Sequence, residues 1–562
     1  MEKRRIDSKY IEEGIDLCAK KKKTYFVLLI IISILLKFQS ANFYTISFIL
    51  ASPNINCSYP PNDDSAGNVA CNVGDVCQWN KNNPNRAIGY TYDPATSGDY
   101  SIVTTYNLEC ENSTVGLIGS AFSLGNAIFT FLYPILQLGI GDALTVKLAV
   151  VLGIIFYSLL FIFPYLWMQA LTGLVTFGLS PLFTNNFQIY FNDFVDKEKR
   201  GFYTMALNSL FPLSGIIYTF IFYFIATWES IRLATLILLV PTFILMVFVM
   251  VDSPIFKFNK HKIDQAINCL HSIAKINNSE AEFIKWKSRI RKEKIGDETF
   301  YFVYPVDKQE EKVELDESIN YSTYKEDETL IKEEIKEEEI VYEAPKSIQK
   351  GFFDTFSTIF KHSEERTLFL VMCFMFLTAG FARCYVSVQL TMVKRINLIS
   401  IIFFFIEGII FIVQGFFSDS KKGGRTLSMK VLFGVGAISL TITLVMTFIH
   451  DKFYRGLVTL LIVRLSQETA SRMSMAIGAE IYSRDVNSWA YGINLFISRL
   501  IGVVATYVIL TFTQLGMFIL IILNILAFVL VFFIKETAQV KIFNTIEEKY
   551  NEINKQPGLK TD

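Results

Sequence analysis

The chain has 562 residues, of which 52% are hydrophobic, and its 53 basic side chains balance 53 acidic ones. A net charge of zero without a sustained basic face argues against nucleic acid binding. The mean hydropathy is +0.37, and charges gather at the N-terminus, in residues 252–366 and in the C-terminal tail. A bilayer core about 30 Å thick needs about 20 apolar residues per spanning helix. The long apolar stretches therefore predict an all-α, multi-pass membrane protein rather than several soluble domains.

Twelve apolar stretches are long enough to be transmembrane helices. They lie at 24–50, 115–138, 147–165, 167–190, 202–226, 231–251, 367–392, 397–418, 427–449, 456–480, 488–511 and 515–534. Six precede and six follow the polar loop 252–366, which predicts two six-helix bundles, 24–251 and 367–534, as in many secondary transporters. The lysines at 20–23 predict that the N-terminus, residues 1–23, is cytoplasmic. An even number of spans returns the tail, residues 535–562, to the same side.

The loop 52–114 between the first two helices holds four of the eight cysteines. They are Cys57, Cys71, Cys77 and Cys110. Four cysteines in one extracytoplasmic loop predict two disulfides, for which three connectivities are possible. The same loop carries two glycosylation sequons, at Asn56 and Asn112, which we expect to be used if the loop is lumenal. Alternatively, the sequons arise by chance in an asparagine-rich chain.

The composition of the loop 252–366 changes along its length. Residues 257–294 are basic and carry isoleucine and leucine at helical spacing, which predicts a helix at the inner membrane surface. Residues 308–343 are strongly acidic, which is typical of a solvated or disordered segment. A regulatory docking role for the acidic segment is the alternative.

Several strings resemble the organic cation and anion transporter family of the major facilitator superfamily, over roughly residues 24–548. They are YDPATSGDYSIVTTYNLEC (92–110), DSPIF (252–256), GFFSDSKKGGR (415–425), AEIY (479–482) and KETAQVKIFNTIEE (535–548). Sugar porters of the same superfamily share the Ser-Pro, Gly-Arg and Glu-Thr strings but keep the first loop short. The resemblance implies the major facilitator fold, with twelve helices in two bundles, and transport of small amphipathic organic ions.

The string 415–425 resembles the superfamily's loop between helices 8 and 9. The resemblance implies that Gly415, Asp419, Gly424 and Arg425 form a clamp between neighbouring helix ends, whose partial charges attract such side chains. A solvated turn at the headgroups is the alternative. The corresponding first-half loop, 133–147, lacks the aspartate and the Gly-Arg pair, so we expect a weaker clamp there.

Ionisable residues at membrane depth are costly unless they are paired or face water, so each is a candidate for a functional site. We predict that five of them bind substrate: Lys37, Arg383, Glu407, Arg472 and Arg499. Alternatively, Arg464 and Glu468 form a structural pair and Glu407 neutralises another arginine. Together with Arg464 and Glu468, these candidates comprise five basic residues against two acidic ones. The surplus of positive charge favours anionic substrates, which arginine binds through a bidentate fork.

The sequence therefore predicts a carrier of small organic ions, most consistent with organic anions, that works by alternating access. One alternative is an organic cation or zwitterion carrier using Glu407 and Glu468. Another is a transport-inactive receptor or membrane scaffold. Because no metal-ligand cluster, nucleotide loop or catalytic constellation occurs, we expect neither an enzyme nor a cofactor. The expected partners are the substrate and the lipid bilayer, and we expect a monomer in the plasma membrane.

Overall fold

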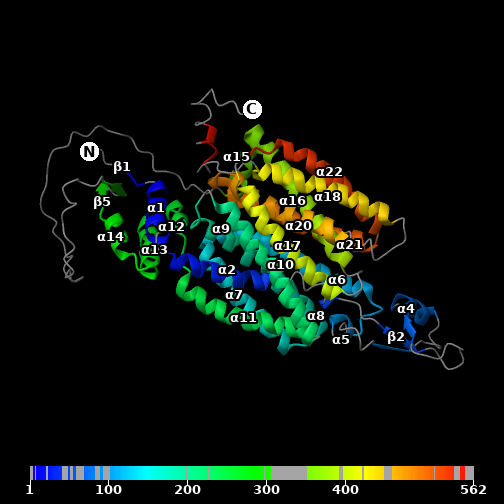
Figure 1. The fold of residues 1–562 in the computed structure, drawn as a ribbon. Coiled ribbons are helices and arrows are strands. Elements are labelled where there is room, and N and C mark those ends of the chain that lie inside the picture. The colour runs from blue at the N-terminus through cyan, green and yellow to red at the C-terminus, as the bar shows by residue number, and fades with distance from the viewer. Residues whose placement is uncertain are drawn as a thin grey trace, which may run out of the picture.

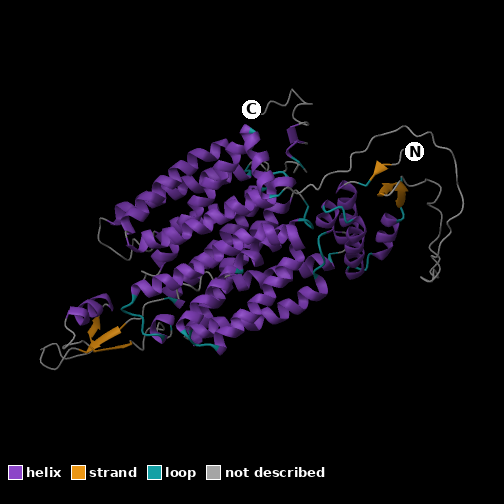
Figure 2. Ribbon diagram, turned by 180° about the vertical axis from the view of Figure 1, so that it is seen from behind, coloured by secondary structure: helices purple, strands orange, loops and turns teal. Residues whose placement is uncertain are grey.

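The computed structural model describes the chain in segments. They are 4–6, 8–20, 23–40, 49–50, 55–58, 69–71, 73–82, 89–92, 101–196, 199–225, 227–295, 298–304, 351–390, 396–420, 423–447, 459–511, 513–536, 545–547 and 549–550. Most of the described chain is helical, and strands occur only beyond the two ends of the helical body (Figure 2). We refer to the end that carries the Cys77–Cys110 disulfide as the disulfide end, and to the end that carries residues 254–303 as the loop end.

The six predicted helices of the first half all form. They are α2 (Thr24–Ser40), α6 (Asn112–Ile140), α7 (Asp142–Ile162), α8 (Leu166–Gly178) continued by the π-helix η3 (Leu182–Asn186) and α9 (Phe187–Asn192), α10 (Arg200–Ile225) and α11 (Trp228–Val249). Many of their buried apolar side chains belong to one large core, while residues such as Ile155 and Phe248 point outward, as lipid-facing side chains do.

The six predicted helices of the second half form as well. They are α16 (Ser363–Leu390), α17 (Ile396–Ser418), α18 (Arg425–Thr447), the π-helix η6 (Thr459–Arg464) with α20 (Leu465–Ile481), α21 (Arg484–Thr511) and α22 (Thr513–Leu530) with η7 (Val531–Phe533). Within the described segments, ten helices are long and apolar enough to cross a membrane. The other two are α2, described only to Ser40, and η6–α20, which contains Arg464, Glu468 and Arg472. The predicted all-α membrane fold is confirmed.

Two helix pairs join the bundles: α10 packs along α17, and α6 packs along α21 (Figure 1). Both contacts depend on glycine. A Cβ at Gly492 of α21 would lie 2.3 Å from Cγ of Pro134 on α6, and one at Gly201 of α10 would lie 2.0 Å from Oδ1 of Asp419. The helix backbones therefore approach more closely than any larger residue would allow.

Beyond the disulfide end lies a small domain formed by part of the loop 52–114 (Figure 1). It contains α4 (Val73–Asn82) and an antiparallel sheet in the order β3-β2-β4, with bounds Val69–Cys71, Ile55–Ser58 and Gly89–Tyr92. The Cys77–Cys110 disulfide ties α4 to the residues before α6. The side chains of Asn56, Cys57, Cys71 and Asn112 lie outside the described part, so their pairing and glycosylation stay predictions.

Beyond the loop end, the N-terminus and the loop after α11 fold together. The elements are α1 (Ser8–Ile15), the π-helix η1 (Asp16–Lys20), α12 (Pro254–Asn259), α13 (Ile263–Ile276), α14 (Glu280–Lys287) and a sheet in the order β1-β6-β5, with bounds Arg4–Arg5, Glu298–Val303 and Ile290–Ile295. We call this the N-terminal loop domain. The acidic segment 308–343 lies outside the described residues, and α15 (Phe352–Lys361) leads into the second bundle.

The prediction of a helix over 257–294 is wrong in its last part. The chain turns into β5 at Ile290 because β6 alternates, placing Tyr301 and Val303 among the buried residues of the core. Burying those side chains against a paired strand outweighs the helical tendency of the lysine-rich sequence.

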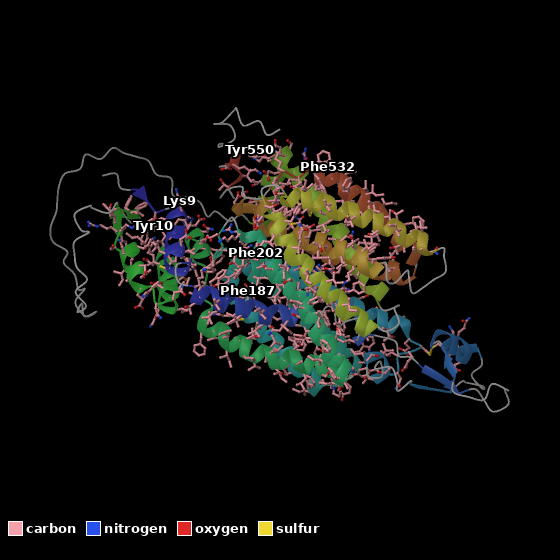
Figure 3. The ribbon with its side chains drawn as sticks, in the orientation of Figure 1. Lys9, Tyr10, Phe187, Phe202, Phe532 and Tyr550 are labelled. Atoms are coloured by element: carbon pink, nitrogen blue, oxygen red, sulfur yellow. A yellow bond between two sulfur atoms is a disulfide. The ribbon has the colours of Figure 1, made fainter. Side chains whose placement is uncertain are left out.

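Tyr10 and Trp286 hold the N-terminal loop domain together. Tyr10, which is labelled in Figure 3, stacks its ring on that of Trp286 with centroids 5.0 Å apart. The Tyr10 hydroxyl donates to the Trp286 carbonyl (2.7 Å), and the Trp286 indole donates to the Tyr10 carbonyl (3.2 Å). Asn277 links this domain to the bundle: its amide donates to the Cys18 carbonyl, and its oxygen accepts from the Tyr25 backbone N–H at the start of α2, both at 2.7 Å.

Candidate functional site

The site begins in the first bundle with Lys37, one of the predicted substrate-binding residues. Lys37 lies on α2, is only 4% exposed, and donates from Nζ to Oδ1 of Asn208 on α10 at 2.7 Å. This partner is neutral, so the bond fixes the position of the ammonium group without cancelling its charge. The charge of Arg472, across the bundle interface, acts on Lys37, which places these two cations in one region.

The second bundle contributes two buried ion pairs. Arg464 donates from Nε to Oε2 of Glu407 at 3.0 Å, and Glu407 is fully buried. Arg383 lies 3.5 Å from Glu468 and donates to the Ser471 hydroxyl at 2.9 Å. Each pair joins two helices, α17 with η6 in one case and α16 with α20 in the other.

The predicted Arg464–Glu468 pair is therefore wrong, because Arg464 pairs with Glu407 and Glu468 pairs with Arg383. Arg464 is the last residue of η6, a π-helical turn, and Glu468 belongs to α20. The π-helical turn changes the helical pitch, so residues four positions apart no longer lie on one face, as the prediction assumed. Glu407 does neutralise an arginine, but that arginine is Arg464 and not another one as predicted.

Two arginines have no carboxylate partner among the described residues. Arg472 on α20 is 4% exposed and lies over the Phe211 ring of α10, 4.4 Å from its centroid. Arg499 on α21 is near Arg383, Arg472 and Glu468, whose charges act on it. The Nε atoms of Arg472 and Arg499 are both buried without a hydrogen bond in the described structure. Sequence reasoning missed Phe211 and Asn208, because an aromatic or amide residue on an apolar helix carries no signal of its own.

At the loop end, Arg425 is the centre of the predicted clamp. It is 1% exposed, its guanidinium pairs with Glu480 of α20, and it lies 3.3 Å from Asp419. Asp419 also accepts from the backbone N–H of Phe202 on α10 at 2.6 Å, which connects the two bundles. Phe202 is labelled in Figure 3. A charge-assisted bond of this kind is stronger than one between neutral groups.

The two clamp glycines each have a steric reason. Gly424 has φ of +78°, a conformation that favours glycine, and a Cβ there would lie 2.4 Å from Oε2 of Glu536. Glu536 accepts from the backbone N–H groups of Arg425 and Thr426 at 3.0 Å, capping α18. A Cβ at Gly415 would lie 3.1 Å from Cβ of Met205 on α10. Glu480 and Glu536 lie in strings that carry the family resemblance, but the sequence did not reveal that they meet Arg425.

A buried cation of the first bundle that sequence reasoning missed is Arg232 of α11. It is 4% exposed, donates to Oε1 of Gln169 and stacks on Trp228 at 4.3 Å. Helix α11 thus supplies a guanidinium to the side-chain amide of Gln169 on α8. A charge within the predicted span 231–251 was the available signal.

Two bundles of six helices, joined by glycine contacts around a buried charged centre, define a membrane transporter fold. The family model of the Major Facilitator Superfamily matches residues 99–506 of the chain. The protein therefore belongs to the major facilitator superfamily, whose members work by alternating access.

Solved structures agree with this fold. The proton:xylose symporter XylE bound to 6-bromo-6-deoxy-D-glucose has a TM-score of 0.57 at 12% identity, covering 94% of this chain and 99% of that one. The partially occluded inward open conformation of the xylose transporter XylE from E. coli has a TM-score of 0.51 at 12% identity, covering 92% and 99%. Identities this low show a shared fold alone. No curated protein matches the chain.

Proposed function

We propose that this protein is a carrier of small organic anions and that Lys37, Arg383, Arg472 and Arg499 form its binding site. The observation that carries the proposal is the imbalance of buried charge. Glu407 and Glu468 each lie in an ion pair with an arginine, whereas Arg472 and Arg499 have no carboxylate partner in the described structure. Buried cations without counter-ions are expensive, and an anionic substrate would supply the missing charge.

The geometry favours a substrate that contacts both bundles. Arg472 of the second bundle lies over Phe211 of the first, and Lys37 of the first bundle is near enough for their charges to interact. A carboxylate held between them would take charge-assisted bonds from both sides. Such a ligand binds most tightly to the conformation in which the two sides converge, which is how binding biases an alternating-access equilibrium. Glu407 then serves the site by holding Arg464 rather than by touching substrate.

Two alternatives make different demands on the same residues. A cation or zwitterion carrier needs an available carboxylate, but both candidates are paired with arginines. A transport-inactive receptor or scaffold has no use for Arg472 and Arg499, whose buried Nε atoms lack a partner in the described structure at a cost in folding free energy. Both alternatives therefore have less support than the anion carrier.

We further propose that the loop end is cytoplasmic and that a monomer resides in the plasma membrane with both termini inside. The lysines at 20–23 next to α2 support this orientation. The Cys77–Cys110 disulfide at the other end supports an oxidising environment there. In this orientation glycosylation is expected at Asn56 or Asn112, and not at Asn277, which is buried and hydrogen-bonded.

The test is a binding titration of an anionic dye with purified, folded Arg499→Ala. Loss of one charge-assisted hydrogen bond costs about 1.5–3 kcal/mol, so affinity should fall by about one to two powers of ten. Arg499→Lys should recover part of it, because an ammonium cannot make the planar fork. Lys37→Ala should show a smaller loss of the same sign.

The matched control is Arg366→Ala, which removes an arginine that is exposed at the loop end. Its dye affinity should equal that of the unmodified protein. Unchanged affinity in well-folded Arg499→Ala would exclude the anion site, and a gain in affinity for a cationic dye would favour the cation carrier.

A further inference from the structure

A second polar cluster lies in the first bundle at the loop end, away from the central arginines. Its members are Tyr133 and Gln137 of α6, Asp142 at the start of α7 and Asn186 at the end of η3. All four side chains are buried, with exposures of 2%, 5%, 5% and 0%. We call this group the Asp142 cluster. It occupies the first-half position that corresponds to the clamp loop of the second half.

The four side chains are close to one another. Asn186 donates from Nδ2 to the backbone carbonyl of Asp142 at 3.4 Å. Gln137 faces the Asp142 carboxylate closely enough to act on it, and the Asp142 charge acts on the Tyr133 hydroxyl. Gly141, with φ of +92°, makes the sharp turn between α6 and α7 that brings Gln137 and Asp142 together. The π-helical turn η3 presents Asn186, and such turns are frequent at functional sites.

Each member has an oxygen without a hydrogen-bond partner in the described structure. The atoms are Tyr133 Oη, Gln137 Oε1, Asp142 Oδ1 and Asn186 Oδ1. An unsatisfied buried polar group costs about 1–3 kcal/mol, and such groups are rare in folded proteins. Gln137 also donates from its side chain to Asp142, which leaves its own oxygen unpartnered. Four such oxygens in one cluster indicate a ligand that accepts electron pairs from oxygen.

The nearby lysines do not compensate the negative charge of Asp142, because each of them has another partner. Nζ of Lys147 donates to the Met250 carbonyl at 2.7 Å, and Lys257 lies 2.7 Å from Asp252. A third lysine, Lys260, donates to the Leu138 carbonyl. The partial charge of about +0.5 at the N-terminus of α7 offsets part of the Asp142 charge.

Two further carboxylates, Asp193 and Asp252, add negative potential at Asp142. A buried water would satisfy the hydrogen bonds of the cluster, but it would leave the carboxylate charge in place. A cation does both.

We propose that the Asp142 cluster binds a sodium ion. Carboxylate, amide and hydroxyl oxygens are hard ligands, which suit alkali and alkaline-earth cations rather than transition metals. Asp142 is the one carboxylate among the four members, so the cluster offers one negative charge and fits a monovalent ion. The bound ion would join α6, α7 and η3, closing the first bundle at the loop end. This assignment is independent of which organic substrate the carrier takes.

The experiment measures sodium binding to the purified full-length protein directly. Equilibrium binding of ²²Na⁺ should be saturable and displaced by unlabelled NaCl but not by choline chloride. In parallel, Tm should rise with NaCl at constant ionic strength, with choline chloride as the balancing salt, because a ligand of the native state stabilises it. Both responses should be lost in Asp142→Asn. Gln137→Met keeps the side-chain size but removes an oxygen ligand, so its sodium affinity should fall at least about tenfold.

The matched control is Asp485→Asn. Asp485 is also a buried aspartate in the first turn of a helix, α21, at the loop end of the second bundle, where it accepts from the Ser483 hydroxyl at 2.6 Å. This variant should keep the full sodium response. Absence of saturable ²²Na⁺ binding to the unmodified protein would overturn the proposal whether or not the variants fold. A Tm that responds to pH but equally to sodium and choline would overturn it in favour of a proton on Asp142.

Discussion

The two bundles close the loop end in different ways. In the second bundle, Arg425 lies between Asp419 and Glu480, and Glu536 caps the helix that Arg425 begins. In the first bundle, Gln137 and Asp142 occupy the corresponding loop, and both have oxygens without a partner in the described structure. One closure is held by side chains of opposite charge, and the other consists of a buried carboxylate and a buried amide that have oxygens without a partner in the described structure.

The comparison extends to the buried arginines. Arg464 of the second bundle is paired with a carboxylate, whereas Arg232 of the first bundle is paired with an amide. The second bundle thus supplies counter-charges to Arg383, Arg425 and Arg464, and the first bundle gives Arg232 a neutral partner. Equivalent substitutions in the two bundles should consequently have unequal effects, because removing a cation costs most where it leaves a carboxylate buried.

The largest effect is expected at Arg425. Arg425→Ala leaves Asp419 and Glu480 without their shared cation, which should cost about 3–5 kcal/mol of stability. Transport by any folded protein should slow, while dye affinity is kept, because the clamp biases conformations rather than touching substrate. Thermal unfolding and dye titration measure the two quantities. Gln137→Ala is the first-bundle counterpart and should lower Tm by less than half as much as Arg425→Ala. Equal decreases in Tm would show that the two closures do not differ in energy.

The next effect compares the two buried arginines. Arg464→Met leaves the fully buried Glu407 unpaired and should cost about 3–5 kcal/mol, whereas Arg232→Met leaves the Gln169 oxygen unsatisfied and should cost about 1–3 kcal/mol. Thermal unfolding of both variants gives the comparison. The Arg464→Met/Glu407→Leu double variant should recover most of the loss, since a buried pair replaced by apolar residues is often tolerated. A double variant no better than the single one would mean that Glu407 has another essential partner.

A smaller effect is expected at the glycine contacts between the bundles. Gly201→Ala places a Cβ against Asp419, so either the carboxylate or α10 must move, at a cost of about 1–3 kcal/mol for overpacking. The loop end should open more often, and a cysteine introduced there should react faster with a thiol-reactive probe. Gly139→Ala on α6, where nothing lies within 4 Å of the new Cβ, is the matched control and should label at the original rate. Equal labelling of both variants would contradict a closed loop end.

The sequence predicted the helices well and the contacts between them poorly. All twelve spans were visible because length and hydropathy are local properties, and the clamp residues were identified through a contiguous string. Partners from distant segments were missed, since nothing local marks Glu536 as the cap of Arg425 or Phe211 as the ring beneath Arg472. The Arg464 pairing was mispredicted because the π-helical turn at 459–464 changes which residues share a face.

The N-terminal loop domain shows the same limit of local reasoning. Residues 1–23 carried only a charge signal, yet Tyr10 and Cys18 pack against α13 and α14, more than 250 positions later in the chain. The β5–β6 pair was missed because its stability comes from burying Tyr301 and Val303 rather than from strand propensity in the lysine-rich β5.

The smallest effect concerns this domain, which supports the loop end of the first bundle from outside. Burial, and to a lesser extent the charge of Glu282, raises the pKa of the Cys18 thiol to about 12, and burial raises that of Cys269 to about 11. Because the folded-state pKa lies above the ordinary value of 9.0, the neutral thiol is favoured by folding. The contribution to stability is complete below pH 9 and is lost as the pH rises from about 9 towards 12.

At pH 8 the thiolate fraction of Cys18 should be about 1,000-fold below that of a free cysteine, so maleimide labelling should be correspondingly slow. Trp286→Ala removes the ring that stacks on Tyr10 and should speed labelling of Cys18 by loosening α1. The matched control is Trp489→Ala, which removes a ring that contacts Phe352 next to the second bundle and should leave Cys18 slow. Mass spectrometry of labelled peptides separates the two thiols. Fast labelling of Cys18 in the unmodified protein would show that the N-terminal segment is not packed on α13, and the first bundle would then lack the outer support that distinguishes it from the second.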